Sequence, residues 1–451
     1  MLPLALILRG HGAKIAGSDR SRDQGRSAEK FAWLEAQGVR LLPQDGSGIT
    51  SSSQILVASA AVESTVPEVI RATELGCPRM TRAELLATLF NASACGIAVG
   101  GTSGKSTITG MLGWIMAQAG RDPTIMNGAV MKNFADADTP FASARVGGGE
   151  VFVSEVDESD GSIALYRPAI AVLNNVSLDH KSLEELRDLF GGFLAASGRA
   201  ALNLDDEETA ALLPFANDAL TFGIDRDDAL LHVEPASINE APTGISATVI
   251  DARDGSRHAL TLRVPGRHNL ANALAALAGA ALAEVPLAEA VAALDSFIGL
   301  ARRFDIVGTS SAGITVIDDF GHNPEKVAAT LDTLRKHPGR IIAFFQPHGF
   351  GPLRQMGREL ADVLATRLGP DDITLLCDPV YFGGTVDRSV SSGHVVGWIE
   401  AAGGHAEHIQ DRTDCADRIV ALARPGDRIV VMGARDDTLT AFARDILARV
   451  D

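Results

Sequence analysis

The chain has 451 residues, 46% hydrophobic and 22% charged, and this composition excludes a disordered or fibrous protein. Its formal net charge of -17 argues against a nucleic-acid partner, because nucleic-acid binding relies on phosphate neutralisation by Lys and Arg. We find no apolar stretch long enough to span a bilayer, no signal-peptide pattern at the N-terminus, and no metal or disulfide spacing among the four cysteines. We therefore expect a cytoplasmic α/β protein with reduced cysteines, no membrane partner and about three domains.

The first part of the chain alternates short strands with helices, which is typical of a Rossmann-like domain. We expect a strand that ends within 14–19, a helix over 28–37 and a second strand over 55–59. The chain opens directly on a helix-like segment at 2–8, without the strand and glycine-rich loop that begin such a domain. We therefore expect either an unusual first unit or a start codon placed too far downstream.

A glycine-rich turn between a strand at 97–99 and a helix at 108–119 is the most informative motif. It consists of Gly101, Thr102, Ser103, Gly104, Lys105, Ser106 and Thr107. In such a turn, backbone N–H groups hold phosphates, the lysine reaches the terminal phosphates and the hydroxyl after it binds Mg²⁺. The pattern is a shortened P-loop, because Val99 stands where the full motif has a glycine. We expect a nucleotide here, and a glycine-rich turn without nucleotide is the alternative.

Acidic residues follow the next apolar strand, at 151–153. Four carboxylates lie within residues 155–160, beginning with Glu155. Strand ends of open parallel sheets are where ligands bind, and carboxylates are ligands that Mg²⁺ prefers. Beside a phosphate loop, this segment predicts a metal site. Taken alone, it would equally fit a solvated acidic loop.

Two further segments carry polar side chains that suit a nucleotide site. The strand at 170–173 leads into His180, which we interpret either as a metal ligand or proton carrier, or as a structural histidine. Asn269 and Asn272 share one face of an alanine-rich helix that follows His268. Their amides fit an adenine edge, although Asn269 would equally serve as a helix cap.

The last part of the chain predicts another parallel sheet, because short apolar strands alternate with helical patterns. The expected strands are 314–317, 341–345, 373–376 and 429–432. Two cations, Arg302 and Arg303, and two carboxylates, Asp318 and Asp319, stand at the entry to this part.

Taken in order, six segments resemble the motifs of the Mur ligase family, and the resemblance covers essentially the whole chain. The segments are G-T-S-G-K-S at 101–106, E-V-D-E-S-D at 155–160, N-V-S-L-D-H at 175–180, G-R-H-N-L-A-N at 266–272, R-R-F at 302–304 and D-D-F-G-H-N-P at 318–324. The resemblance implies an α/β fold of three domains. These are an N-terminal Rossmann-like domain for a UDP-sugar at 1–94, a central P-loop ATPase domain at 95–300 and a C-terminal Rossmann-like domain for an amino acid at 301–451.

The family chemistry implied is an ATP-dependent ligation in peptidoglycan biosynthesis. A substrate carboxylate attacks the γ-phosphate of ATP to form an acyl phosphate, and the amine of an amino acid then displaces phosphate. Arg82-Ala83-Glu84 and Gln346-Pro347-His348 resemble the members that join UDP-N-acetylmuramate to L-alanine. The implied partners are therefore small molecules, with ATP and Mg²⁺ as cofactors.

The resemblance also implies roles for individual residues. Lys105 and Ser106 would hold the β- and γ-phosphates and one Mg²⁺, and Glu155 and His180 would complete the metal coordination. The other contacts to ATP would come from His268, Asn269, Asn272, Arg303 and Asp319. The implied catalytic residues are Lys105, Glu155, His180 and Arg303.

The substrate side departs from the family pattern. Alanine-adding members continue Q-P-H with Arg-Tyr-x-Arg, whereas this chain has Gly349 to Pro352, and its nearest cation is Arg354. Position 177 is Ser where relatives commonly have Glu, and the glycine turn that contacts the UDP diphosphate in the family is not in this sequence. Our candidate substrate contacts are Asp19, Ser59, His322, His348 and Arg354.

Three hypotheses remain open. The first is a ligase that joins UDP-N-acetylmuramate to L-alanine. The second is a paralogue that either ligates a peptide to a muramate in cell-wall recycling or acts on a carboxylate without UDP. The segment Leu173-Asn174-Asn175 resembles that of the recycling ligases. The third is a non-catalytic nucleotide-binding partner, against which the presence of Lys105, Glu155, His180 and Asp319 argues.

Overall fold

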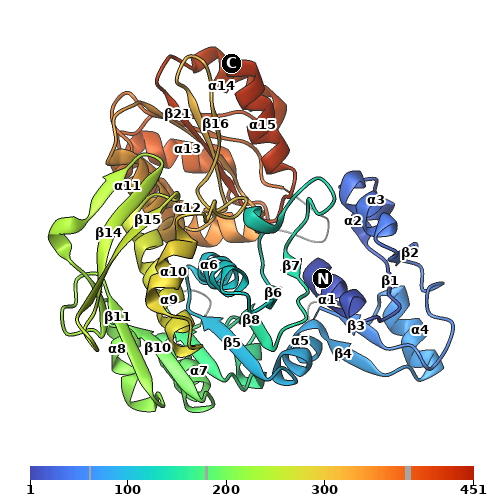
Figure 1. The fold of residues 1–451 in the computed structure, drawn as a ribbon. Coiled ribbons are helices and arrows are strands. Elements are labelled where there is room, and N and C mark those ends of the chain that lie inside the picture. The colour runs from blue at the N-terminus through green and yellow to red at the C-terminus, as the bar shows by residue number, and fades with distance from the viewer. Residues whose placement is uncertain (60–61, 178–180, 381–386) are drawn as a thin grey trace. The chain divides into compact units, whose positions relative to one another are not determined.

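A computed structural model describes residues 1–59, 62–177, 181–380 and 387–451, and its fold is α/β (Figure 1). The chain divides into two compact units. The first contains residues 1–239, 246–263 and 269–299, and the second contains residues 240–245, 264–268 and 300–451.

The N-terminal part of the first unit contains two separate two-stranded parallel sheets, β1 with β2 and β3 with β4. Its strands are β1 (Ala16–Gly17), β2 (Arg40–Leu41), β3 (Leu56–Ala58) and β4 (Arg79–Thr81). Its helices are α1 (Leu2–Gly10), α2 (Arg20–Asp23), α3 (Ala28–Ala36), α4 (Pro67–Leu75) and α5 (Arg82–Asn91). The expected alternation of strand and helix is therefore present, with strands shorter than the sequence pattern indicates.

A large mixed sheet forms the centre of the first unit, in the strand order β13-β14-β12-β11-β10-β9-β5-β8-β6-β7, with β15 paired to β14. The strands are β5 (Cys95–Gly100), β6 (Thr124–Met126), β7 (Ala144–Arg145), β8 (Val151–Glu155), β9 (Ile170–Leu173), β10 (Arg199–Asn203), β11 (Ala219–Gly223), β12 (Leu231–Val233), β13 (Asn239–Ala241), β14 (Gly244–Asp251) and β15 (Ser256–Leu262). The helices are α6 (Lys105–Gln118), α7 (Leu183–Ala195), α8 (Glu207–Ala211), α9 (Arg267–Leu282) and α10 (Leu287–Leu294). Strand β5 is central and runs parallel to both of its neighbours, β8 and β9.

Apolar side chains cover both faces of this central sheet. On one face, Phe190 and Phe193 of α7 pack with Phe90 of α5 against the strands. On the other face, α6 is buried on nearly every side from Ser106 to Met116, and α9 packs so closely that a side chain at Gly279 would meet both Val172 and Leu112. Because alternate residues of a strand point to opposite faces, the continuous apolar runs of β5 and β9 fit a sheet covered on both sides.

The second unit contains a six-stranded sheet in the order β16-β17-β21-β18-β19-β20, parallel except for β16. The strands are β16 (Asp305–Thr309), β17 (Thr315–Asp319), β18 (Ile341–Gln346), β19 (Ile373–Leu376), β20 (Ala406–His408) and β21 (Arg428–Gly433). The helices are α11 (Pro324–Arg335), α12 (Phe350–Arg367), α13 (Ser392–Ala401), α14 (Arg412–Leu422) and α15 (Leu439–Val450).

Alternation along β18 builds the two cores of the second unit. Ile341, Ala343 and Phe345 belong to a core shared with α11, α12 and α13. Ile342 and Phe344 point the other way, into a core shared with α14 and α15. Because both faces of the sheet are apolar, polar side chains gather at the carboxyl ends of the strands and in the loops that follow them.

Within the part of the chain that the structure describes, none of the helices combines the length and apolar character needed to cross a membrane.

Candidate active site

The register of three neighbouring strands brings the predicted nucleotide residues together. Val99 at the end of β5 pairs with Glu155 on β8, and Gly100 pairs with Leu173 on β9. The glycine-rich loop, the acidic loop and the segment after β9 therefore leave the sheet side by side. The carboxyl ends of parallel strands are where α/β sheets bind ligands.

The glycine-rich loop has the backbone geometry of an anion-binding turn. Gly101 has φ +132° and Gly104 has φ +86°, both outside the range that other residues adopt readily. A Cβ at Gly104 would lie 2.4 Å from Asn272 Oδ1. Helix α6 begins at Lys105 without a side-chain cap or an acidic residue in its first turn. Its N-terminus therefore presents backbone N–H groups and the positive end of the helix dipole toward the loop.

The predicted phosphate-binding lysine is held by two acceptors. Lys105 Nζ donates to Gly101 O at 2.6 Å and to Glu158 Oε2 at 2.7 Å. The side chain of Lys105 is 19% exposed and that of Glu158 is 6% exposed. The ammonium is thus fixed over the mouth of the loop by an ion pair that is largely shielded from water.

Ser106 and Glu155 lie together as the magnesium prediction requires. Ser106 Oγ donates to Glu155 Oε2 at 2.7 Å. Gly128 makes room for this carboxylate, because a Cβ there would lie 2.2 Å from Glu155 Oε1. Among the described residues, no group of three His, Cys, Asp or Glu side chains is placed to hold a metal. A hydroxyl and one carboxylate suit Mg²⁺, which keeps several waters and phosphate oxygens as ligands. His180, the third predicted ligand, lies outside the described residues.

The segment after β9 holds the glycine-rich loop in place. Thr102 N donates to Asn175 O at 3.1 Å, and Ser103 N donates to Asn175 Oδ1 at 2.8 Å. The hydroxyls of Thr102 and Ser177 lie 2.8 Å apart. Ser177 therefore anchors the loop. Thr107 continues the loop into α6 and is buried there.

A chain of three buried amides lies beside the loop. Asn174 Nδ2 donates to Asn272 Oδ1 at 3.4 Å, and Asn272 Nδ2 donates to Asn269 Oδ1 at 3.2 Å. Asn174 Oδ1 is buried and has no hydrogen-bond partner among the described residues. An unpaired buried acceptor is costly, which fits a position that awaits a donor from a ligand or water.

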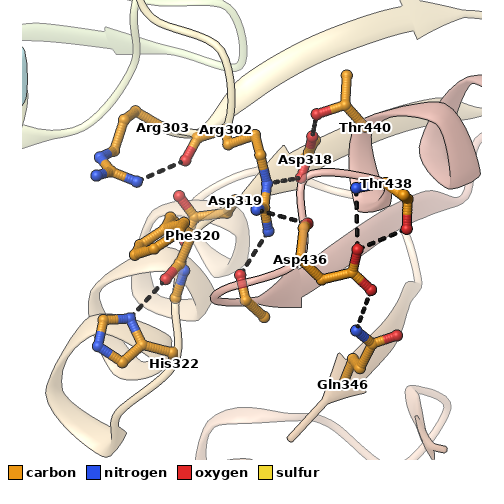
Figure 2. A network of polar contacts seen from close by, with 12 residues as sticks. Arg302, Arg303, Asp318, Asp319, Phe320, His322, Gln346, Asp436, Thr438 and Thr440 are labelled. Atoms are coloured by element: carbon orange, nitrogen blue, oxygen red, sulfur yellow. Dashed lines mark hydrogen bonds and ion pairs between the residues drawn. The ribbon is translucent and has the colours of Figure 1, made fainter. Parts of the chain in front are cut away.

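In the second unit, Arg302 joins the ends of two strands (Figure 2). Its Nε lies 3.4 Å from Asp318 Oδ1, its Nη1 donates to Asp436 O at 3.0 Å and its Nη2 donates to Gly433 O at 2.5 Å. Burial raises the pKa of Asp318, against the opposing effect of Arg302 and of a hydrogen bond from Thr440. Arg302 is therefore a structural cation in this unit.

Asp319 and Arg303 directly follow Asp318 and Arg302 in the sequence. Asp319 accepts hydrogen bonds from Phe304 N at 2.8 Å, Gly321 N at 3.0 Å and Thr330 Oγ1 at 2.7 Å. Arg303 lies 4.3 Å from the centre of the Phe320 ring and donates to Arg302 O at 3.2 Å. The carboxylate of Asp319 thus fixes the backbone that carries Arg303.

Two of the substrate candidates, His322 and His348, line one pocket with mostly apolar side chains, among them Phe345, Leu353 and Met356. The two imidazole rings lie edge to face, 5.2 Å apart. Burial lowers the pKa of His322 to about 4, helped by Lys326, and Nδ1 of this histidine lies 2.9 Å from Phe320 O. The ring is therefore neutral at pH 7.

The remaining candidates have local partners. Arg354 pairs with Asp387 at 2.9 Å on the surface. Asp19 caps α2 by accepting from Ser21 N at 2.7 Å, and Ser59 directly follows β3. His268 belongs to the second unit and is exposed to solvent.

The sequence did not single out several residues of these two clusters. Glu158 was visible only as one acid among those of 155–160, and Asn174 only within the segment Leu173-Asn174-Asn175, without a role of its own. In the second unit, Gln346, Arg412 and Asp436 form a network in which Gln346 Nε2 and Arg412 Nη1 donate to Asp436 Oδ2 at 2.8 and 2.9 Å (Figure 2 shows the first contact). The available signal was position, since Gln346 ends β18 and Asp436 follows β21.

Family models match nearly the whole chain. A model described as the Mur ligase family catalytic domain matches residues 1–94, the Mur ligase middle domain matches 99–280, and the Mur ligase glutamate ligase domain matches 302–435. The chain therefore belongs to the Mur ligase family, and it is an enzyme, an ATP-dependent ligase.

Curated relatives point to one member of that family. Proteins named UDP-N-acetylmuramate–L-alanine ligase are 32% identical in Streptomyces coelicolor, over 97% of this chain and 93% of the relative, and 34% identical in Sorangium cellulosum, over 100% and 94%. Among solved structures, UDP-N-acetylmuramate-alanine ligase of Thermotoga maritima has a TM-score of 0.82 at 23% identity, covering 100% of this chain and 96% of that one. A murein peptide ligase of Psychrobacter arcticus has a TM-score of 0.69 at 24% identity, with the same coverage. The expected three-domain Mur ligase fold is thus confirmed.

Proposed function

We propose that this chain joins UDP-N-acetylmuramate to L-alanine at the expense of ATP, in the synthesis of peptidoglycan. The observation that carries the proposal is the name shared by relatives that are 32 to 34% identical over almost the full chain. The grouping of Lys105, Ser106 and Glu155 at one sheet edge supplies the matching chemistry. Because ATP and UDP-sugars are cytoplasmic metabolites, we place the reaction in the cytoplasm.

The residues of the first unit suit phosphoryl transfer to a carboxylate. Two anions must approach each other, so positive charge has to meet the negative charge that develops on the bridging oxygen. Lys105 and the N–H groups at the start of α6 supply that charge from fixed positions. Ser106, Glu155 and His180 would hold Mg²⁺, which when bound adds positive charge to the phosphate oxygens.

The second half-reaction needs an amine beside the activated carboxyl carbon. The amine attacks, a tetrahedral centre forms and phosphate leaves, with loss of one proton from the nitrogen. We assign the amino acid to the part of the chain at 301–451. There His322 and His348 line a small pocket whose other side chains are mostly apolar. We assign the UDP-sugar to residues 1–94 and ATP to residues 95–300. The adenine contacts are assigned to His268, Asn269 and Asn272. The phosphate contacts from the last part of the chain are assigned to Arg303 and Asp319.

A second candidate is ligation of a peptide to a muramate, as in recycling. The observation that favours it is the segment Gly349 to Pro352, which lacks the cations of the alanine-adding members, while Arg354 is engaged by Asp387. A peptide substrate carries its terminal carboxylate farther from the reacting amine and would not need a cation at this place.

The test is phosphate release by the full chain with MgATP and a matrix of substrates. UDP-N-acetylmuramate and free N-acetylmuramate would each be paired with L-alanine, other amino acids and L-alanyl-γ-D-glutamyl peptides, and products identified by mass spectrometry. We expect UDP-N-acetylmuramate and L-alanine to give the largest kcat/KM. A peptide as the preferred amine would establish the second candidate, and no release with any pair would show a non-catalytic nucleotide-binding protein.

A further inference from the structure

Glu158 is a second carboxylate beside the loop that we expect to bind a polyanion, and it is buried. It comes three residues after Glu155, the last residue of β8, and is 5% exposed. Its Oε2 accepts a hydrogen bond of 2.7 Å from Lys105 Nζ. Two carboxylates at and just after the end of β8 thus hold two consecutive side chains of the glycine-rich turn, since Glu155 accepts from Ser106.

Among the described residues, the hydrogen bonds of the Lys105 ammonium leave one donor unused. A lysine has three N–H groups, and the hydrogen bonds to Glu158 and to Gly101 O use two of them. The third is available to a phosphate oxygen without breaking either contact. A buried carboxylate left without its cation would be costly, so the ion pair is best kept throughout the reaction cycle.

We propose that Glu158 is a positioning residue, which holds the Lys105 ammonium over the phosphate loop before the nucleotide arrives. A free lysine side chain has many rotamers, and ordering it during the reaction opposes charge stabilisation in the transition state. Glu158 and Gly101 O remove that freedom in advance. Because the phosphates themselves also attract the lysine, the contribution of Glu158 falls mainly on kcat rather than on nucleotide binding.

Two other roles for Glu158 predict different behaviour. If Glu158 competed with phosphate for Lys105, its removal would tighten MgATP binding. If Glu158 were a ligand of Mg²⁺, its removal would raise the Mg²⁺ concentration needed for half-maximal rate. The geometry favours neither. The third donor of Lys105 can meet a phosphate while the contact with Glu158 stays, and the hydroxyl expected at the metal is contacted by Glu155 instead.

The experiment compares Glu158→Ala, Glu158→Gln and the matched control Glu150→Ala, which removes an exposed glutamate at the opposite end of β8. The turnover assay rests on the proposed function. We expect Glu158→Ala to lower kcat at least about tenfold, with the KM for MgATP and the Mg²⁺ requirement within about threefold of the parent. Glu158→Gln keeps an acceptor for Lys105 and should stay within about threefold of the parent kcat, as should the control.

A second readout does not depend on turnover. NMR of the ¹⁵N-labelled lysine ammonium groups should show a slowly exchanging Lys105 signal in the parent and in Glu158→Gln, and its loss in Glu158→Ala. An inactive parent that keeps this pattern would refute the proposed function and leave the positioning role supported. An unchanged kcat or Lys105 signal in Glu158→Ala would overturn the inference, as would tighter MgATP binding, a shifted Mg²⁺ requirement, or an equal loss in Glu158→Gln.

Discussion

The carboxylate of Asp319 accepts a hydrogen bond from the backbone N–H of Phe304 over 2.8 Å, which ties the loop that carries Arg303 to the end of β17. Arg302 and Phe304 both have positive φ, +61° and +47°, so this loop adopts a conformation that non-glycine residues disfavour. Its shape therefore depends on bonds such as this one.

Replacing Asp319 with Asn should loosen that loop. The Oδ2 atom of Asp319 accepts from two donors, and an amide cannot satisfy the donors on both oxygens at once. We expect a loss of about 1 to 3 kcal/mol in the free energy of unfolding, measured by urea denaturation, together with a higher KM for MgATP. Thr330→Ser keeps the hydroxyl and is the control. Unchanged stability in Asp319→Asn would show that these bonds do not hold the loop.

Lys105 should be indispensable for turnover. We expect Lys105→Ala to lower kcat by about a thousandfold, because charge on the migrating phosphoryl group is no longer met by the ammonium. The measurement is steady-state phosphate release, with the exposed Lys14→Ala as a control. Since the single change leaves Glu158 buried without its cation, the pair Lys105→Met with Glu158→Gln removes both charges and separates folding from catalysis. A near-normal rate in either variant would remove Lys105 from the mechanism.

A methyl group at Gly128 should disturb the metal without disturbing the fold. The added Cβ would lie 2.2 Å from Glu155 Oε1, and the flexible end of Glu155 can turn away from it at little cost. Turning away breaks the contact with Ser106, so the Mg²⁺ concentration for half-maximal rate should rise by about tenfold. The control is Gly192→Ala in α7, where a Cβ meets nothing within 4 Å. An unaltered Mg²⁺ dependence with intact stability would argue against Glu155 as a ligand.

The partly buried imidazole of His322 should make stability depend on pH. Its folded pKa is about 4 and its ordinary value is 6.5, so between these values the unfolded chain binds more protons than the folded chain. The free energy of unfolding should therefore fall as pH falls from 6.5 toward 4, by up to about 3 kcal/mol, and change little above pH 7 from this group. Denaturation of the parent and of His322→Gln at several pH values isolates the effect. Parallel pH profiles for the two proteins would contradict it.

Local sequence patterns located the sheets well. The strands expected at 170–173 and 373–376 have those bounds in the structure, because continuous apolar runs leave few other conformations for a buried strand. The helix after the phosphate loop begins at Lys105 rather than at 108, since Lys-Ser-Thr has no apolar periodicity although it forms the first turn. In the N-terminal part, β1 covers only Ala16–Gly17. The residues around it are polar and largely exposed, so no hydrophobic pattern in the sequence marked where this strand begins and ends.

The residues of the candidate nucleotide site could be predicted from the sequence, but their contacts with one another could not. Residue identity placed Lys105 and Ser106 at phosphates and Glu155 at a metal, and the structure brings these three side chains together. The partner of Lys105 was beyond reach, because the contact with Glu158 joins residues 53 positions apart and depends on the register of β5 against β8. The roles of His180 and of the substrate candidates stay predictions.

Helix α6 has almost no face that meets water, with ten of its residues, from Ser106 to Met116, buried. A segment enclosed in this way opens only when the surrounding core opens, so its amide hydrogens should exchange with solvent among the slowest in the first unit. The glycine-rich loop at the start of α6 is then held rigidly. Substitutions that adapt the enzyme to another acid or amine would therefore have to accumulate elsewhere in the chain.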